Sequence, residues 1–387
     1  MTAVQWQFEA LDTYFFREAA PFHAGEGGQG GQSSIFPPMM STLQGVIRYQ
    51  LALSQGWRPG VDNSLPSELG DINHLGNLRL SGPYLYCNKE LLLPAPLFLL
   101  RLHDEGKNGK GYYRLLPGDP VSCDLGRVRL PVMPDGVRGA KPLDNYWLTL
   151  SALEKVLAGG FLEDDGSAAG AGQSVANIPA NGVVGSDQLW KSEPKVGIGR
   201  EKDTRSAKDK NIYAINMIRP KKEVSVVVGV DGIPKEWSIA ENFRNKIVNL
   251  GGEGKLAKLD ILEQLIELPA MPELTSVKGK VRFTVTLITP GYFGNQEQTR
   301  NAIMNLKPWI NQTCVTACVG KVRQIGGWDL SNDRPRPLRS FIPAGSTWFF
   351  EGVEADINGL AKLHGQYIGE SNAYGYGQIL VGRWEDK

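Results

Sequence analysis

The sequence predicts an α+β protein with two ferredoxin-like domains, the βαββαβ arrangement that also occurs in RNA-recognition modules (RRM-like). Three observations support this fold class. The order of predicted strands and helices occurs twice, a glycine-rich loop precedes the last strand of each copy, and 387 residues are too many for one small core. We expect a first domain at residues 1–270, with a large insertion at about 55–210, and a second domain at residues 271–387.

The first copy is predicted mainly from hydrophobic periodicity. A helix is expected after Pro37-Pro38 and Ser41, because Leu43, Ile47 and Leu51 recur at helical spacing. In chain order this copy has a strand at 6–16, that helix, strands at 212–218 and 224–230, a helix at 236–250 and a strand at 257–261. The insertion is expected to contain strands at 78–86 and 97–102 and a helix at 151–158.

The second copy repeats this order without a large insertion. It is predicted to contain a strand at 281–289, a helix at 296–306, strands at 315–325 and 341–351, a helix at 357–364 and a last strand at 379–384. A repeated βαββαβ order is typical of the split-βαβ, ferredoxin-like unit.

Two glycine-rich loops occupy the same predicted position in the two copies. Their glycines are Gly251, Gly252 and Gly254 in the first copy, and Gly375, Gly377 and Gly382 in the second, with the spacing G-x-G-x-x-x-x-G. Each loop is expected to follow a short amphipathic helix and to lead into a strand. Because the phosphate-binding loops of ATP and NAD proteins run from a strand into a helix, the sequence predicts neither cofactor.

The overall composition is that of an ordinary folded chain. It has 42 basic and 41 acidic residues and 41% hydrophobic residues, which argues against the disordered and collagen-like classes. No run of about 18 apolar residues exists, and the first 20 residues lack an apolar secretory core. We therefore expect a cytoplasmic protein without membrane contact. The four cysteines include no C-x-x-C pair, so we expect reduced thiols, no metal and no cofactor.

The nearly neutral total hides a basic segment at residues 191–222. This segment has ten basic and four acidic residues. Such a surplus favours contact with a polyanion, although a solvated loop without a partner would have the same composition.

Support for catalysis is limited to one histidine. Among the four histidines, His23 lies at the end of the first predicted strand beside glycines, where a ribose hydroxyl could approach. It could act as a general base, but a lone imidazole is more often a hydrogen-bonded structural group. No H-E-x-x-H or G-x-S-x-G motif is present.

Binding of nucleic acid has broader support. Glycine loops bring backbone amides close to a ligand, and Lys255, Tyr374 and Tyr376 beside them offer a charge for phosphates and rings for bases. Ser41 and Thr42, at the start of the first helix, could present amides to another phosphate, or Ser41 could simply cap that helix. The arginines at 334, 336 and 339 could meet RNA or an acidic protein equally well.

A series of short motifs occurs in a specific order along the chain. They are Pro21-Phe22-His23-Ala24-Gly25-Glu26, Phe36-Pro37-Pro38, Ser41-Thr42-Leu43, Val196-Gly197-Ile198-Gly199, Thr204-Arg205, Ile212-Tyr213, Leu250-Gly251-Gly252-Glu253-Gly254, Thr289-Pro290, Gly326-Gly327-Trp328-Asp329, Pro343-Ala344-Gly345-Ser346 and Gly375-Tyr376-Gly377. Through these ordered motifs the chain resembles RAMP-superfamily subunits of type III-B CRISPR (Cmr) effector complexes, those that hold the five-prime handle of the guide RNA.

The resemblance implies two ferredoxin-like domains whose glycine loops face a shared cleft for the repeat-derived end of the guide RNA. It also implies a non-catalytic subunit that packs against the large polymerase/cyclase subunit and a neighbouring backbone RAMP subunit. Two positions depart from the expected pattern. His23 stands where aspartate is expected, which keeps a catalytic role open, and Arg336-Pro337 stands where lysine-proline is expected.

The resemblance thus implies a subunit that binds and caps the five-prime handle of the crRNA in antiviral defence. The expected RNA-binding residues are His23, Gly25, Ser41, Thr42, Arg48, Lys195, Gly197, Gly199, Arg200, Arg205, Gly251, Gly252, Gly254, Lys255, Tyr374, Gly375, Tyr376 and Gly377. One alternative is a metal-independent endoribonuclease that processes CRISPR repeat RNA with His23 as general base. Another is a scaffold that contacts only proteins.

Overall fold

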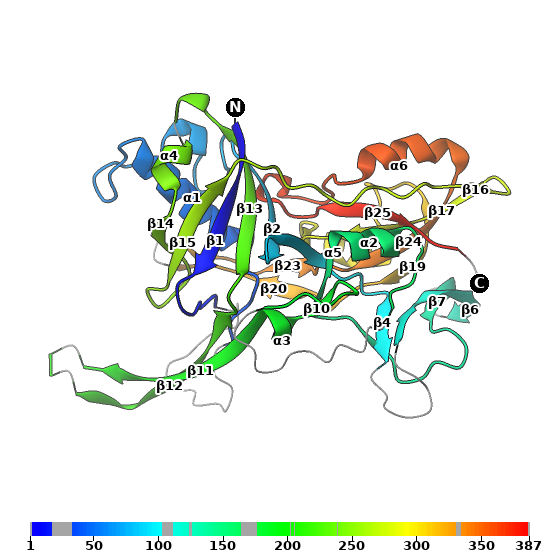
Figure 1. The fold of residues 1–387 in the computed structure, drawn as a ribbon, viewed down its shortest axis with the longest axis horizontal. Coiled ribbons are helices and arrows are strands. Elements are labelled where there is room, and N and C mark those ends of the chain that lie inside the picture. Colours follow the sequence, from blue (N-terminus) through cyan, green and yellow to red (C-terminus); the bar gives the residue numbers. More distant parts are fainter. Residues whose placement is uncertain are drawn as a thin grey trace.

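The computed structural model describes residues 2–17, 33–102, 111–123, 126–163, 176–201, 203–204, 206–237, 239–329 and 334–385. It shows a sheet-rich α+β fold, which confirms the predicted class (Figure 1). Two antiparallel sheets form the framework, and short helices and smaller sheets pack on them. None of the described helices is long and apolar enough to cross a membrane.

The N-terminal sheet has eight strands in the order β10-β9-β3-β2-β13-β1-β15-β14. Its strands are β1 (Thr2–Ala10), β2 (Arg79–Cys87), β3 (Glu90–Pro94), β9 (Tyr146–Thr149), β10 (Val183–Gly185), β13 (Val224–Ile233), β14 (Lys246–Asn249) and β15 (Leu256–Leu262). Along the chain, α1 (Met40–Ser54) lies between β1 and β2, and α4 (Ile239–Phe243) lies between β13 and β15. The central strands β2, β13, β1 and β15 pair antiparallel throughout.

The second strand of the first predicted copy was placed wrongly. Residues 212–218 pair with β11 in a separate two-stranded sheet, and β2 pairs with β13 instead. Part of the predicted insertion is therefore integral to the sheet. A proline inside a run argues against a central strand, and β2 contains Gly82-Pro83. The sheet accommodates this pair beside a register shift between Val227 and Gly229.

The helix predicted at 236–250 is also wrong over its second half. Helix α4 ends at Phe243, and Asn245 adopts φ 55°, a left-handed conformation that asparagine tolerates and that ends a helix. The chain then returns as β14, which pairs with β15. The first glycine loop therefore connects two strands of a hairpin and does not follow a helix.

The C-terminal sheet has the order β16-β17-β24-β19. Strand β25 also pairs with β17, on the edge away from β24, next to β16 along the strand. Its elements are β16 (Ser276–Val277), β17 (Lys280–Leu287), α5 (Gln296–Met304), β19 (Thr313–Cys318), β24 (Thr347–Val353), α6 (Ile357–Leu363) and β25 (Ile379–Arg383). The predicted strand at 315–325 divides into β19 and β20 (Arg323–Ile325), and that at 341–351 into β23 (Arg339–Ile342) and β24. Gly382 lies within β25 and not in the loop before it.

Smaller elements surround the two sheets. They are β4 (Leu99–Leu102), β5 (Gly111–Arg114), β6 (Leu116–Cys123), β7 (Gly126–Val132), β8 (Lys141–Pro142), α2 (Leu150–Leu157), α3 (Ser186–Leu189), β11 (Trp190–Arg200), β12 (Ala207–Pro220), β18 (Gly291–Tyr292), β21 (Trp328–Asp329), β22 (Arg334–Pro335), and the 3-10 helices η1 (Ser67–Leu69), η2 (Lys235–Trp237), η3 (Glu354–Asp356) and η4 (Asn372–Tyr374). Helix α2 begins where predicted because the Thr149 hydroxyl accepts a hydrogen bond from the Ala152 amide.

The insertion also covers one face of the C-terminal sheet. Neighbouring residues of a strand point to opposite faces of the sheet. Phe350 of β24 packs in the core between this sheet and helix α6, together with Leu360 of α6. Phe349 packs on the other side, against Phe98 at a ring distance of 5.6 Å and in one cluster with Leu153 of α2. The sheet face that an RNA-recognition module would offer to bases is therefore filled by protein.

Candidate nucleic-acid interface

Strands β11 and β12 form a long two-stranded ribbon that projects from the body (Figure 1). It carries much of the basic segment found in the sequence. Lys191, Lys195 and Arg200 are exposed on β11, and within the described ranges none of them forms an ion pair. An exposed ribbon with uncompensated cations is suited to phosphate contact.

Exposed aliphatic side chains lie on the same ribbon. Val196 is 70% exposed and Ile198 is 45% exposed. Both lie on one face of β11, because residues two apart in a strand share a face. Lys195 lies on the opposite face of β11.

The base of the ribbon is fixed to the body by a small apolar cluster and by ion pairs. Ile215 and Met217 of β12 pack against Phe15. Arg219 donates hydrogen bonds to Asp12, at 2.6 Å, and to Glu193. These bonds hold the pKa of both carboxyl groups below their usual values.

The first glycine loop supports this base. It closes the β14–β15 hairpin, and the Gly252 amide donates a 2.8 Å hydrogen bond to the Phe15 carbonyl. Lys255 forms a 3.7 Å ion pair with Asp12, and its side chain is only 16% exposed. A phosphate contact of Lys255 would therefore compete with its ion pair to Asp12. Gly252 and Gly254 are exposed, so their backbone remains accessible to a ligand.

The second glycine loop is buried. Gly375 and Gly377 both have left-handed backbones, and a Cβ atom at Gly377 would lie 2.0 Å from the Ile368 carbonyl oxygen. The hydroxyl of Tyr376 accepts a 3.3 Å hydrogen bond from the Ser41 amide, and burial raises the pKa of Tyr376 to about 12. The ring is 5% exposed, so stacking of Tyr376 on a base is not supported, whereas Tyr374 is half-buried.

A cavity of about 1360 Å³ lies between the two sheets and begins at the base of the ribbon. Trp190, the first residue of β11, lines it together with Phe36, and their rings are 4.8 Å apart. Tyr376 also lines it, but no glycine of the first loop does. The expectation that both glycine loops line one cleft is therefore not supported for the first loop.

Two cations of the cavity wall were missed by the sequence analysis. Lys321 and Arg323 line the cavity and are exposed. Arg336 and Arg339 are exposed nearby in the chain, and within the described ranges none of these four forms an ion pair. The K-V-R spacing around Val322 was a local signal, but only the fold places these residues on the wall of the cavity that Trp190 also lines.

The remaining expected contacts are distributed unevenly. Ser41 is exposed, yet it lies in the first turn of α1 and does not cap it, because Met39 occupies the cap position. Thr42 is half-buried, and Gly197 and Gly199 lie half-buried in the ribbon. Arg48 is 8% exposed and donates to the Asp71 carbonyl at 2.6 Å, which makes it a structural residue. The predictions for His23, Gly25 and Arg205 lie outside the described residues.

Neither a metal-binding group nor an ionised thiol is found among the described residues. They contain no group of three or more His, Cys, Asp or Glu side chains that could hold a metal. Burial raises the pKa of Cys87 to about 11 and those of Cys314 and Cys318 to about 12, so these thiols stay protonated at neutral pH. His364 is held between the Pro269 carbonyl and the Val381 amide.

Comparison with known proteins shows to which class of protein this chain belongs. The chain matches the family model described as CRISPR-associated protein (Cas_Cmr3) over residues 6–384. Fold and match together define a RAMP-like subunit of type III-B CRISPR systems. The chain belongs to the Cmr3 family.

A curated relative and two solved structures agree with this assignment. The relative is CRISPR system CMR subunit Cmr3 of Saccharolobus solfataricus, which is 26% identical over 161 residues. The match covers 41% of this chain and 44% of the relative, so less than half of the relative's length is matched. A chain of the type III-B Cmr-beta bound to cognate target RNA and AMPPnP has a TM-score of 0.51 at 18% identity, and 89% of this chain and 86% of that one are covered. A chain of Cmr-beta bound to cognate target RNA has a TM-score of 0.51 at 17% identity, with 97% and 96% covered. These likenesses show a shared fold.

Proposed function

We propose that this protein is a non-catalytic subunit that binds the five-prime handle of the crRNA and caps one end of a type III-B effector complex in the cytoplasm. In this function it contacts the large polymerase/cyclase subunit and a neighbouring backbone RAMP subunit. The observation that carries the proposal is the basic ribbon β11–β12, which starts at the aromatic wall of a large cavity.

We further interpret the chain as two ferredoxin-like domains, 1–270 and 271–387. The order β2-β13-β1-β15 recurs as β19-β24-β17-β25, with a helix after the first and third strand in chain order of each set. This is the arrangement of a split βαβ unit. Because protein covers the sheet face of the second unit, RNA would use the ribbon and the cavity instead.

Several features suit the cavity and ribbon to a single-stranded RNA. Cations on the ribbon and on the cavity wall, Lys195 and Arg323 among them, can follow a phosphate backbone, while aromatic rings such as Trp190 can support unpaired bases. The Val196 face gives the ribbon an apolar surface for a base or ribose.

The test measures binding to a labelled RNA with the repeat-derived handle from the same CRISPR locus. Replacing Lys191, Lys195 and Arg200 together by alanine should weaken binding about tenfold or more. It should also lower the salt-dependence slope by about 0.7 for each lost phosphate contact. Lys362→Ala, on exposed α6 outside the interface, is the matched control and should bind as the wild type.

Equal affinity of the triple variant and the wild type at every salt concentration would contradict the proposal. No affinity for the handle in the wild type would favour the protein-only scaffold. Cleavage of repeat RNA without metal, abolished by His23→Ala, would establish the ribonuclease alternative.

A further inference from the structure

The base of the ribbon carries four charged side chains that contact one another, the ribbon-base quartet of Asp12, Glu193, Arg219 and Lys255. Arg219 donates to one carboxylate oxygen of Asp12 at 2.6 Å, and the Lys255 ammonium lies 3.7 Å from the other oxygen. Arg219 also donates to both carboxylate oxygens of Glu193. The two acids therefore balance the two cations, and the ribbon-base quartet has no net charge at neutral pH.

The ribbon-base quartet interrupts a row of cations on the ribbon. Lys191, Glu193 and Lys195 alternate along β11 and so share one face of the strand. Arg219 of β12 pairs with Lys191 and lies on the same face. Lys191 and Lys195 are exposed. A phosphate backbone that follows these cations, as the proposed function requires, therefore passes the carboxylates of Glu193 and Asp12.

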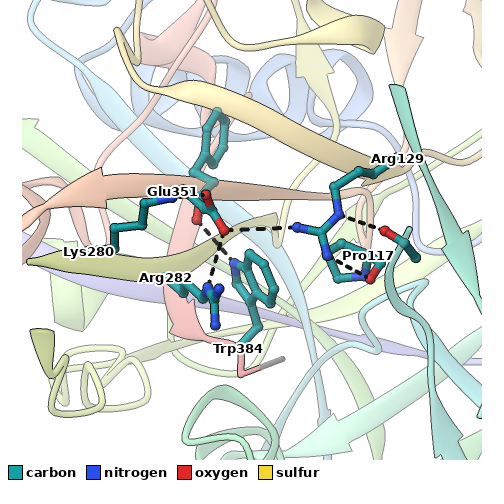
Figure 2. Close-up of polar contacts among 8 residues, drawn as sticks. Pro117, Arg129, Lys280, Arg282, Glu351 and Trp384 are labelled. Carbon is teal, nitrogen blue, oxygen red and sulfur yellow. Dashed lines mark hydrogen bonds and ion pairs between the residues drawn. The ribbon is translucent and has the colours of Figure 1, made fainter. Parts of the chain in front are cut away.

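The carboxylates of the ribbon-base quartet are open to solvent. The side chain of Asp12 is 60% exposed and that of Glu193 is 48% exposed. Figure 2 shows the contrasting case of Glu351, which pairs with Lys280 and Arg282 and is only 22% exposed. Glu351 is enclosed by protein and serves the fold, whereas a phosphate from solution can reach Asp12 and its partners.

The first glycine loop ends at Lys255 and offers exposed backbone beside it. Gly252 and Gly254 are exposed, and Gly254 has φ 63° with open space around its Cβ position. Backbone amides in such a turn attract anions. Glu253, the carboxylate of this loop, is not paired with Lys255, and within the described ranges the ion-pair partner of Lys255 is Asp12. Asp12 therefore decides whether the Lys255 ammonium is available to a phosphate at the loop.

The contact between Lys255 and Asp12 is the weakest in the ribbon-base quartet. Its 3.7 Å separation exceeds a hydrogen-bond distance, whereas Arg219 donates hydrogen bonds to two carboxylates. An ion pair with a solvent-exposed partner contributes little to stability. Contact between a cation and RNA phosphate releases counterions, which favours the exchange of partners. A phosphate can thus displace Asp12 from Lys255 while Arg219 keeps both of its acids.

We propose that Asp12 is an intramolecular competitor of RNA phosphate: its carboxylate pairs with Lys255 in the free protein and gives Lys255 up to a phosphate when RNA binds. This inference rests on the proposed RNA binding and adds a residue that limits its strength. Asp12 acts through Lys255 and is therefore a positioning residue. It lowers the electrostatic, sequence-independent part of the RNA affinity.

The test measures binding of the full chain to labelled handle RNA over a range of salt concentrations, below the melting temperature of each variant. Asp12→Asn removes the charge but keeps the shape, and it should bind about threefold to tenfold more tightly than the wild type at low salt. The gain should shrink as salt rises, because salt screens the pairing of Asp12 with Lys255.

Glu9→Gln is the matched control for the change in net charge. Glu9 lies on β1, is 48% exposed and pairs with Lys258 at 3.8 Å. The substitution therefore breaks a similar ion pair three residues away from Asp12 without touching the ribbon-base quartet. Its RNA affinity should stay within about twofold of the wild type.

Lys255→Met tests the route through the lysine and does not depend on the Asp12 variant. It should lower the salt-dependence slope by about 0.7, the value for one phosphate contact on a single strand. The double variant Asp12→Asn, Lys255→Met should bind within about twofold of Lys255→Met, because no ammonium remains to be released. An unrelated RNA of equal length should gain affinity for Asp12→Asn by the same factor as the handle, because a phosphate contact carries no sequence information.

Unchanged or weaker binding by Asp12→Asn would overturn the inference. An equal gain in Glu9→Gln would do the same, because the effect would then come from net charge. A gain that persists in the double variant, or one confined to the handle sequence, would also contradict it. Absence of RNA affinity in the wild type refutes the proposed function, whereas normal wild-type binding without a gain in Asp12→Asn refutes this inference alone.

Discussion

The contrast between the two glycine loops gives the sharpest test of the structure. From the sequence, bulky replacements in either loop should weaken RNA binding more than the fold. The structure predicts this outcome only for the first loop. Gly254 has φ 63° with open space around its Cβ position, whereas a Cβ at Gly377, with φ 80°, meets the Ile368 carbonyl oxygen at 2.0 Å.

The expected magnitudes follow from this geometry. Alanine in a left-handed backbone costs about 1–2 kcal/mol at either position. At Gly377 the new methyl group must also displace Ile368, whose amide donates to the Gly377 carbonyl at 2.9 Å. Overpacking of this kind adds about 1–3 kcal/mol. Gly377→Ala should therefore be about 2 kcal/mol less stable than Gly254→Ala, which corresponds to roughly 2–3 °C in melting temperature for a chain of 387 residues.

The assay compares the thermal unfolding of Gly377→Ala, Gly254→Ala and the wild type, and then measures handle-RNA affinity well below each melting temperature. Gly377→Ala should melt lowest and bind RNA as well as the wild type does, whereas Gly254→Ala should bind RNA more weakly than the wild type. If Gly377→Ala melts with the wild type but fails to bind RNA, the buried packing of the second loop is wrong and the loop contacts RNA directly.

Two further predictions concern titratable side chains. Burial raises the pKa of Glu351, but the hydrogen bonds and charges of Lys280 and Arg282 outweigh it and lower that pKa, so the stabilisation by Glu351 is present at neutral pH and is lost as pH falls through the folded-state pKa. Glu351→Gln should lower the free energy of unfolding by about 1–2 kcal/mol at pH 7 in urea unfolding, and an equal difference at pH 3 would contradict this reasoning. Burial lowers the pKa of His364, so the folded state binds fewer protons and stability falls as pH drops below the unfolded-state pKa of about 6.5. The melting temperature should decrease from pH 7.5 to 5.5 in the wild type and change less in His364→Gln. Parallel decreases in the two proteins would rule out this histidine as the cause.

Local patterns predicted the elements that depend on local physics. Helix α1 was predicted from the spacing of Leu43 and Ile47, and the alternation of Ala257 and Leu259 predicted β15. Most strands and helices of the C-terminal unit were also predicted. Errors occurred where a local pattern was compatible with two structures. At residues 246–249 the apolar residues continue the helical spacing, but Asn245 reverses the chain and these residues form a strand.

Strand partnership was less accessible to the sequence. Residues 212–218 form a good strand, and nothing local states whether their partner is β13 or β11. Residues 212–218 are close to β13 in the chain, whereas β2 is far from it and contains Gly82-Pro83. The sequence therefore favoured residues 212–218 as the partner of β13, which is wrong. Pairing depends on contacts between distant residues, which periodicity does not encode.

The candidate site divides in the same way. The sequence by itself determined the α+β class, most elements of the second predicted copy, the basic segment and the ordered motifs of the family, because composition and spacing are local properties. Only the tertiary structure decided which of those residues face solvent. It placed Lys191, Lys195 and Arg200 of the basic segment on an exposed ribbon that starts at a cavity, added Lys321 and Arg323 to the wall of that cavity, and buried Arg48 and Tyr376. Burial and juxtaposition arise from long-range packing, so they separate a binding residue from a structural one of the same type.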